Sequence, residues 1–146
     1  MPDRCALLRP ESALQTCRLI VAATYFWSGL AKLNPNFFAV VFPSLFTTFV
    51  AAVPPLISHL AFLAPMVECG AGIGLLTTRF RSPALFCAAG THGFILLAIG
   101  PLGSRFNAVV WPWNLAMIAV LFVLFFGPVK RPFLRTTACP KVSRTT

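Results

Sequence analysis

Residues 66–99 read MVECGAGIGLLTTRFRSPALFCAAGTHGFILLAI, which is two apolar runs joined by Arg79, Phe80 and Arg81. An α-helix needs roughly 20 apolar residues to cross the hydrocarbon core of a bilayer. Positive charge in a short connection marks the cytoplasmic-type side of a membrane. The stretch therefore predicts two membrane helices, over about residues 55–77 and 83–99, with a basic turn between them.

Two further apolar runs flank this pair. One covers about residues 14–33 and ends at Asn34 and Pro35, and the other covers about residues 109–126 and ends at Gly127 and Pro128. Asn, Gly and Pro at these positions are helix-stop signals. The aromatic segment at 37–53 carries Pro43, Thr47 and Thr48 and is followed by two prolines, and we interpret it as interfacial or re-entrant. The predicted fold is an all-α integral membrane protein, a single-domain transmembrane bundle of four helices.

Composition and charge agree with this topology. The chain has 146 residues, of which 58% are hydrophobic and 10% charged, and its formal net charge is +9. The topology puts both termini, the 79–81 turn and a basic tail at 128–146 on the cytoplasmic-type side, where anionic lipid supplies the counter-charge. Only Arg105 falls in a loop on the other side. Nucleic-acid binding is not expected, because no basic stripe lies on a polar domain.

Ten basic residues share the cytoplasmic-type side in this topology. They are Arg4, Arg9, Arg18, Arg79, Arg81, Lys130, Arg131, Arg135, Lys141 and Arg144.

Four polar residues lie inside the predicted spans, where burial costs free energy: Lys32, Glu68, His92 and Asn114. Glu68 and His92 are each about nine residues from the same end of their helices, so they share a layer of the bundle. If their helices are neighbours, the two side chains can exchange a proton. The alternative is that they satisfy each other and fix the helix register.

Lys32 lies near the outer end of the first predicted helix. Side chains tilt toward the N-terminus of their helix, so Lys32 leans back into the membrane rather than out to the headgroups. Tyr25, Ser28 and Gly29 share its face at helical spacing, with Thr24 beside them. A buried lysine can act as a base or nucleophile, while a bridging or headgroup-anchoring lysine is the structural alternative.

We take Lys32, Glu68 and His92 as candidate catalytic residues. The candidate substrate-binding residues are Tyr25, Ser28, Trp111, Trp113 and Asn114. The two tryptophans also fit an interfacial aromatic belt. The five cysteines are widely spaced and show no zinc-ligand pattern, so no metal site is predicted.

Four segments carry a family resemblance: residues 25–34 (YFWSGLAKLN), 68–76 (ECGAGIGLL), 91–94 (THGF) and 111–114 (WPWN). With them the chain resembles the DoxX and MauE group of small four-helix membrane proteins, and half of the membrane domain of vitamin K-dependent carboxylases and their bacterial relatives. In the carboxylases, the lysine at the position of Lys32 is the base. The chain lacks the other half of that domain and its extramembrane domain, so carboxylation of a protein is not expected.

The resemblance implies a DoxX-like subunit that supports quinone- or thiol-linked electron transfer, with Glu68 and His92 handling protons and Lys32 lining a cavity. The sequence does not identify a cofactor: it holds no redox centre, so a quinone or a partner must carry the electrons. Other membrane subunits are the expected partners. The alternative is a non-catalytic structural or assembly subunit, in which small residues dock a larger complex.

Overall fold

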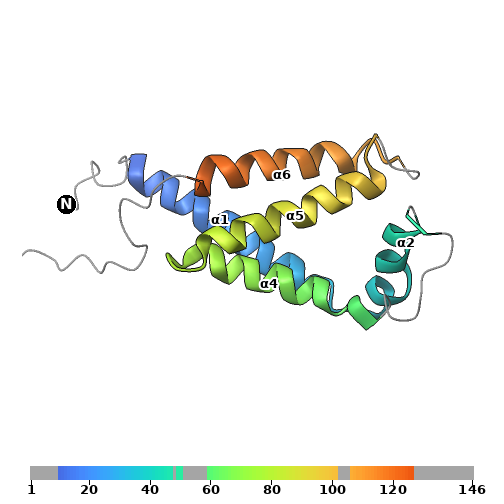
Figure 1. Cartoon of the computed structure of the whole chain (residues 1–146). Helices are drawn as coiled ribbons and strands as arrows, with labels where there is room; N and C mark the ends of the chain where they lie inside the picture. Colours follow the sequence, from blue (N-terminus) through green and yellow to red (C-terminus); the bar gives the residue numbers. More distant parts are fainter. Residues whose placement is uncertain (1–9, 48, 51–58, 102–105, 127–146) are drawn as a thin grey trace, which may run out of the picture.

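The computed structural model describes residues 10–47, 49–50, 59–101 and 106–126, and all regular secondary structure in them is helical (Figure 1). The long helices are α1 (Pro10–Ala31), α4 (Leu63–Leu76), α5 (Arg81–Ile99) and α6 (Val110–Phe125). A π-helix, η2 (Phe37–Val41), runs directly into the short helix α2 (Phe42–Phe46). The prediction of an all-α chain is confirmed for these residues.

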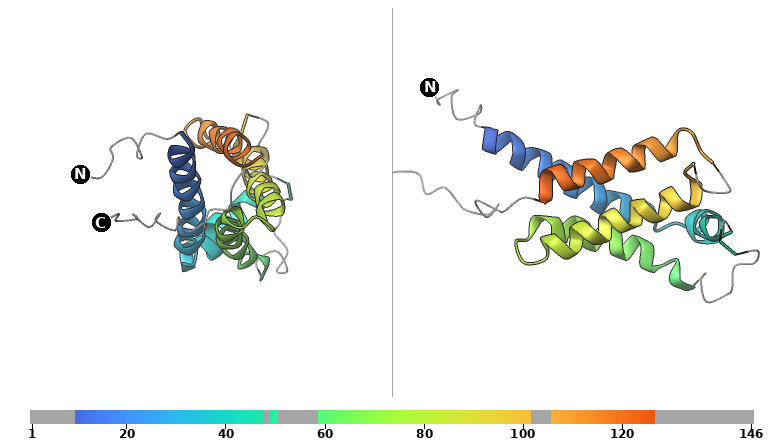
Figure 2. Two further views of the ribbon diagram at one scale, coloured as in Figure 1. Left: turned by 90° about the vertical axis from the view of Figure 1, so that its left-hand side faces the viewer. Right: turned by 45° about the horizontal axis from the view of Figure 1, so that its top comes forward.

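The four long helices form a bundle in which each packs on the next. Helix α1 packs on α4, α4 on α5 and α5 on α6, whereas α1 and α6 meet only lightly. The end-on view in Figure 2 shows the four helices grouped around a common axis. Side chains of all four helices join in one core, which contains Ala22, Tyr25, Ala71, Leu75, Ala84, Leu85, Ala88, Met117, Leu121 and Phe125.

Helix α1 begins and ends earlier than the predicted range of 14–33. It starts at Pro10, a residue that suits the first turn because it lacks the N–H that would be unpaired there. Its end is fixed by Asn34, whose amide nitrogen donates to the carbonyl of Ala31 at 2.7 Å. The amide oxygen of Asn34 accepts the N–H of Phe37 at 2.9 Å, so one side chain links α1 to the next helical segment.

The second predicted range, 55–77, is longer than the helix observed there. Residues 51–58 lie outside the described part of the chain, and Ala61 and Phe62 form a turn before α4 begins at Leu63. Pro65 falls in the first turn of α4, where its missing N–H costs no helical hydrogen bond. Helix α5 starts at residue 81 rather than 83, and α6 lies within the predicted 109–126 range.

One described helix, α5, is long and apolar enough to cross a membrane. Helices α4 and α6, and the segment 37–46, are apolar but shorter. Helix α4 has 14 residues, which is roughly 21 Å at 1.5 Å per residue. The described helices thus provide one candidate span where the sequence predicted four.

The segment predicted to be interfacial or re-entrant forms η2 and α2, which lie at the end of the bundle near the α5–α6 connection (Figure 1). Phe37 and Phe42 are buried there with Ala61 in a second small core. Phe46 of α2 packs on Phe94 of α5, with ring centroids 5.1 Å apart. Aromatic contacts therefore tie this segment to the end of the bundle.

Helices α1 and α4 approach unusually closely because glycines lie at their crossing. A Cβ added at Gly29 would stand 2.6 Å from Cys69 Sγ and 2.8 Å from the carbonyl oxygen of Pro65. A Cβ at Gly72 would stand 2.7 Å from the carbonyl oxygen of Ala22. Small residues permit this backbone contact. The crossing brackets Glu68, so it sets the position of that carboxylate relative to α1.

Candidate functional site

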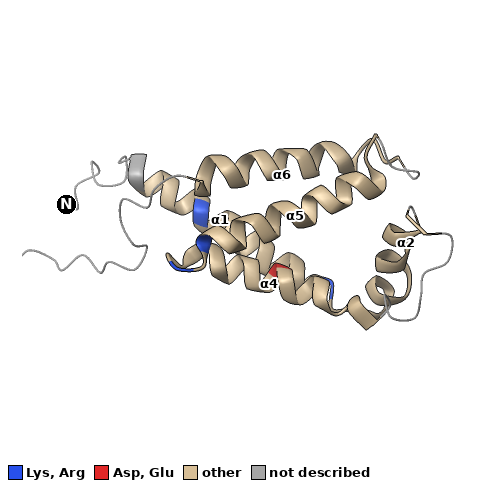
Figure 3. Cartoon of the chain, viewed as in Figure 1, with Lys and Arg blue, Asp and Glu red and all other residues tan. Residues whose placement is uncertain are grey.

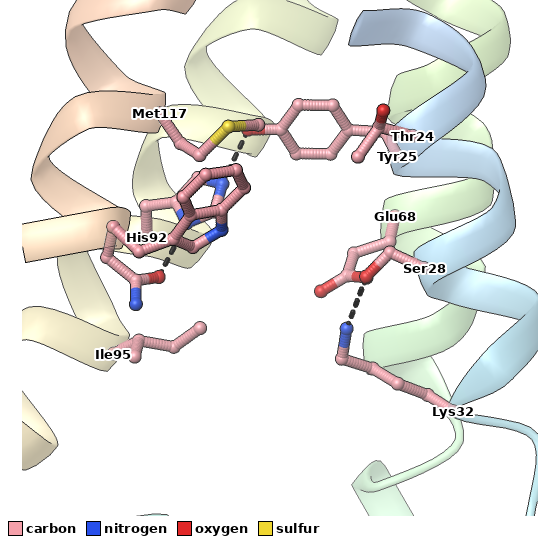
Figure 4. Close-up of a pocket in the computed structure, with 10 residues that line it drawn as sticks. Thr24, Tyr25, Ser28, Lys32, Glu68, His92, Ile95 and Met117 are labelled. Carbon is pink, nitrogen blue, oxygen red and sulfur yellow. Dashed lines mark hydrogen bonds and ion pairs between the residues drawn. The ribbon is translucent and has the colours of Figure 1, made fainter. Parts of the chain in front are cut away.

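A polar cavity lies between the four long helices, and Figure 4 shows its lining. Its volume is about 170 Å³. Polar side chains from all four helices border it, so its shape depends on the whole bundle. The lining residues are Thr24, Tyr25 and Ser28 of α1, Lys32 directly after α1, Glu68 of α4, His92 and Ile95 of α5, and Trp113, Asn114 and Met117 of α6.

An ion pair between Lys32 and Glu68 forms one side of the cavity (Figure 4). Lys32 Nζ lies 2.6 Å from Glu68 Oε2 and donates a second hydrogen bond to Ser28 Oγ at 2.8 Å. The lysine side chain thus reaches back one turn along α1, in the direction expected for a helical residue. The Glu68 side chain is 7% exposed and that of Lys32 is 26% exposed. Each charge compensates the other in a largely water-free setting.

A hydrogen-bonded chain of Tyr25, His92 and Asn114 forms the other side. The Asn114 amide nitrogen donates to the carbonyl oxygen of Val110 at 2.8 Å, and its Oδ1 lies 2.6 Å from His92 Nδ1. The hydroxyl of Tyr25 lies 2.5 Å from His92 Nε2. Tyr25 therefore reaches from α1 across to α5, which links the two sides.

These contacts fix the tautomer of neutral His92. The Asn114 Oδ1 can only accept a hydrogen bond, so Nδ1 must carry the ring hydrogen. Nε2 is then the basic nitrogen, and the Tyr25 hydroxyl donates to it. A proton taken up at Nε2 would make both ring nitrogens donors, which would turn the O–H of Tyr25 away from His92. The chain can therefore hold and pass on one proton.

Most sequence-predicted site residues lie together. Lys32, Glu68, His92, Tyr25, Ser28, Trp113 and Asn114 all line the cavity, whereas Trp111 is not among its lining residues. Residues 111 and 113 are two apart, which is about 200° around a helix, so one cavity does not face both. The catalytic and binding roles remain predictions.

Glu68 and His92 were predicted to be able to share a proton, but in the structure they hydrogen-bond different partners. Glu68 bonds Lys32, and His92 bonds Tyr25 and Asn114. Three lining residues were not in the predicted site: Thr24, Ile95 and Met117. Ile95 and Met117 each stand three positions after a predicted site residue, His92 and Asn114, so helical spacing was the signal that could have found them. Thr24 was placed beside the polar face of the first predicted helix but not in the site.

The described residues contain no group of three or more His, Cys, Asp or Glu side chains that could hold a metal ion. The cavity is close in size to a single six-membered ring. A protein cavity of about 150 Å³ accommodates benzene, and this one has about 170 Å³. The remaining N–H of the Lys32 ammonium, and the Tyr25 hydroxyl when His92 is protonated, can donate hydrogen bonds to a bound ligand from opposite sides.

Comparisons of the chain with family models, with curated proteins and with solved structures found no match.

Proposed function

We propose that the chain is a four-helix integral membrane protein with both termini on the cytoplasmic-type side. Support comes from the outer surface of the bundle, where large apolar side chains face outward on every long helix. Examples are Ile20 on α1, Ile73 on α4, Phe86 on α5 and Val123 on α6, the last 81% exposed. Many large apolar side chains on the exterior of a bundle with buried polar groups are costly in water and favourable in lipid.

Within that setting, the cavity is a binding site for the ring of a quinone, and the chain is a DoxX-like subunit of a membrane oxidoreductase. The observation that carries this proposal is the placement of the Lys32–Glu68 pair and the Tyr25–His92–Asn114 chain on opposite sides of one ring-sized space. Ionisable groups inside a membrane protein are expensive and mark functional sites by default. Here Lys32 and Glu68 hold each other in place, and His92 is held by Tyr25 and Asn114.

A bound quinone would supply two-electron carrier chemistry, with electrons from a partner subunit of the complex. The chain's own residues would hold the ring and deliver protons. Lys32, charged and compensated by Glu68, would hold one proton beside the ring from the α1 side. His92 Nε2, reached through the hydroxyl of Tyr25, would hold a proton on the α5 side. Met117 and Ile95 would shield the ring from water.

Equilibrium binding of a short-tailed benzoquinone to the purified chain in lipid nanodiscs tests this. Lys32→Met and His92→Phe should weaken binding about tenfold or more, which corresponds to loss of one good hydrogen bond. Trp113→Ala should also weaken it, because Trp113 lines the cavity. Trp111→Ala is the matched control and should change little. Absence of binding by the wild type, or equal loss in the control, would reject the quinone site.

A second candidate function is that of a structural subunit, and Gly70 favours it. A Cβ added at Gly70 meets no atom within 4 Å, so packing within the described chain does not require a glycine there. Gly70 borders an apolar groove of about 410 Å³ between α4 and α5, with Val67, Ile73 and Thr77. A helix of another subunit would fit against such a small-residue surface. Loss of a copurifying subunit in Gly70→Leu, with quinone binding intact, would favour this role.

A further inference from the structure

Two arginines converge at the end of the bundle where α6 finishes, far from the polar cavity. Arg18 comes from α1 and Arg81 is the first residue of α5. The guanidinium carbon of each lies 6.0 Å from the centre of the Phe125 ring. Figure 3 shows these basic residues at one end of the bundle, with the acidic residue of α4 further along. Two like charges from different helices are thus brought to one aromatic side chain.

The hydrogen bonds made by the two guanidinium groups do not use all of their N–H donors. Arg18 Nε donates to the carbonyl oxygen of Leu124 at 2.7 Å, in the last turn of α6 where carbonyls lack helical partners. Arg81 Nε donates to the carbonyl oxygen of Leu75, at the longer distance of 3.4 Å. The Arg81 residue is only 7% exposed, and its Nη1 is buried without a hydrogen-bond partner. A buried guanidinium nitrogen without an acceptor is costly, so an acceptor is missing from the described part of the chain.

The described side chains also provide no negative charge for this pair. Glu68 is the acidic side chain among them, and it is bound to Lys32 at 2.6 Å. The whole chain has three acidic residues against 12 basic ones. Two adjacent guanidinium groups repel each other unless an anion lies between or beside them. An anion bound at this pair would supply both the acceptor and the negative charge.

We propose that Arg18 and Arg81 together bind one phosphate group. A guanidinium is a planar fork whose paired N–H groups match two oxygens of a phosphate, and a phosphate has enough oxygens to serve two forks. The low exposure of Arg81 keeps water from competing for those bonds. The group belongs either to the headgroup of an anionic phospholipid or to a soluble phosphate compound. Its binding would tie α1, α5 and the end of α6 together.

The test uses the full-length chain and three variants. Arg18→Gln removes one fork, and Arg81→Lys keeps the charge but removes the fork of the buried arginine. Arg79→Gln is the matched control: it removes the same charge at the same end, but Arg79 is exposed and stacks only on Phe80. Arg18 is half-buried, so Arg18→Gln keeps the test valid even if a variant at position 81 does not fold.

Two measurements distinguish the sources of the phosphate. Native mass spectrometry after extraction from membranes containing phosphatidylglycerol and phosphatidylcholine reports retained phospholipid, and thermal unfolding in detergent with inorganic phosphate reports the soluble source. We expect wild type and Arg79→Gln to retain the anionic lipid or to be stabilised by phosphate. Both effects should fall about tenfold in Arg18→Gln and Arg81→Lys. No retention and no stabilisation in wild type, or an equal fall in Arg79→Gln, would overturn the site.

Discussion

The ion pair stabilises the charged form of Glu68 more than that of Lys32, because the carboxylate is the more deeply buried partner. Lys32→Met should leave an uncompensated carboxylate beside the cavity and destabilise the bundle by about 3 kcal/mol, the lower end for a broken buried pair. The lower end applies because a quarter of the lysine side chain is exposed. Thermal or denaturant unfolding of the detergent-solubilised protein measures this.

The double variant Lys32→Met/Glu68→Leu, compared with the two single variants in a double-mutant cycle, tests whether the two side chains interact directly. Removing both charges should restore most of the lost stability, because an apolar pair of similar size has no charge to compensate. Quinone binding should stay weak in the double variant, which separates the structural from the functional role of the pair. Additive losses in the double variant would contradict a direct ion pair.

The tautomer of His92 is a second prediction at this scale. In wild type, ¹⁵N NMR of labelled histidine should show the ring hydrogen of neutral His92 on Nδ1, because Asn114 Oδ1 only accepts. Asn114→Leu removes that acceptor, so the hydrogen should move to Nε2 and be donated to Tyr25. The chain has two histidines, and His59→Gln isolates the signal. A wild-type hydrogen on Nε2 would contradict the assigned chain.

The sequence identified which polar residues lie inside the bundle but not how they pair. Depth along a helix follows from residue number, which is why Lys32, Glu68 and His92 could be selected. Pairing depends on which helices are neighbours and how each is rotated about its axis. The depth of a residue along its helix determines neither. Glu68 and His92 were predicted to share a layer of the bundle. In the structure, the close α1–α4 crossing brings Glu68 next to Lys32 instead. His92 is held by a hydrogen bond with Asn114 of α6.

At the scale of elements, the α1–α4 crossing is the contact that positions the ion pair. Gly72→Ala places a methyl group within 2.8 Å of the backbone of Ala22 and Phe26, which must then move. Overpacking of this kind should destabilise the protein by about 1–3 kcal/mol. It should also weaken quinone binding, since Glu68 lies one turn away on α4. Unfolding and binding measurements on the same preparation check both effects.

Gly70→Ala is the control for that variant, because it lies two residues away on the same helix with nothing within 4 Å of the added atom. A glycine in a helix interior is less favourable than alanine by about 0.5–1 kcal/mol. Gly70→Ala should therefore leave stability unchanged or raise it slightly. An equal loss in both variants would mean that helix geometry at this region, rather than contact with α1, is responsible.

The four long helices among the described residues were predictable from the sequence, whereas their ends, the short helices η2 and α2, and the extent of each span were not. Apolar runs identify α1, α4, α5 and α6 because their composition differs from the connections. Their ends depend on particular hydrogen bonds, such as that of Asn34 on the carbonyl of Ala31, which an apolar run does not encode. The short α4 follows from a turn at residues 61–62, inside a run that reads as uniformly apolar.

At the scale of the whole molecule, a few polar side chains are buried beside an apolar core, and large apolar side chains are exposed on every long helix. Helix α5 is 19 residues long, roughly 28 Å, and so matches the hydrocarbon core of a bilayer by itself. Arg18 and Arg81 lie at one end of the bundle, with Arg79 two residues before Arg81, which is the distribution expected if that end faces the basic side of a membrane. Helix α1 has 22 residues but includes Arg18, whose bond to Leu124 keeps the charge at that end.

Four spans require the two ends of the bundle to face opposite sides of the membrane, and single cysteines in a cysteine-free background test this. Thr78 lies in the α4–α5 turn, and Thr47 and Pro101 lie at the opposite end; all three are exposed. A membrane-impermeant maleimide should label Ser12→Cys and Thr78→Cys from the cytoplasmic-type side, and Thr47→Cys and Pro101→Cys from the other. Labelling of Thr78→Cys and Pro101→Cys from one side would show that α5 does not cross. Labelling of Ser12→Cys and Thr47→Cys from one side would show the same for α1, and would place the cavity at the membrane surface.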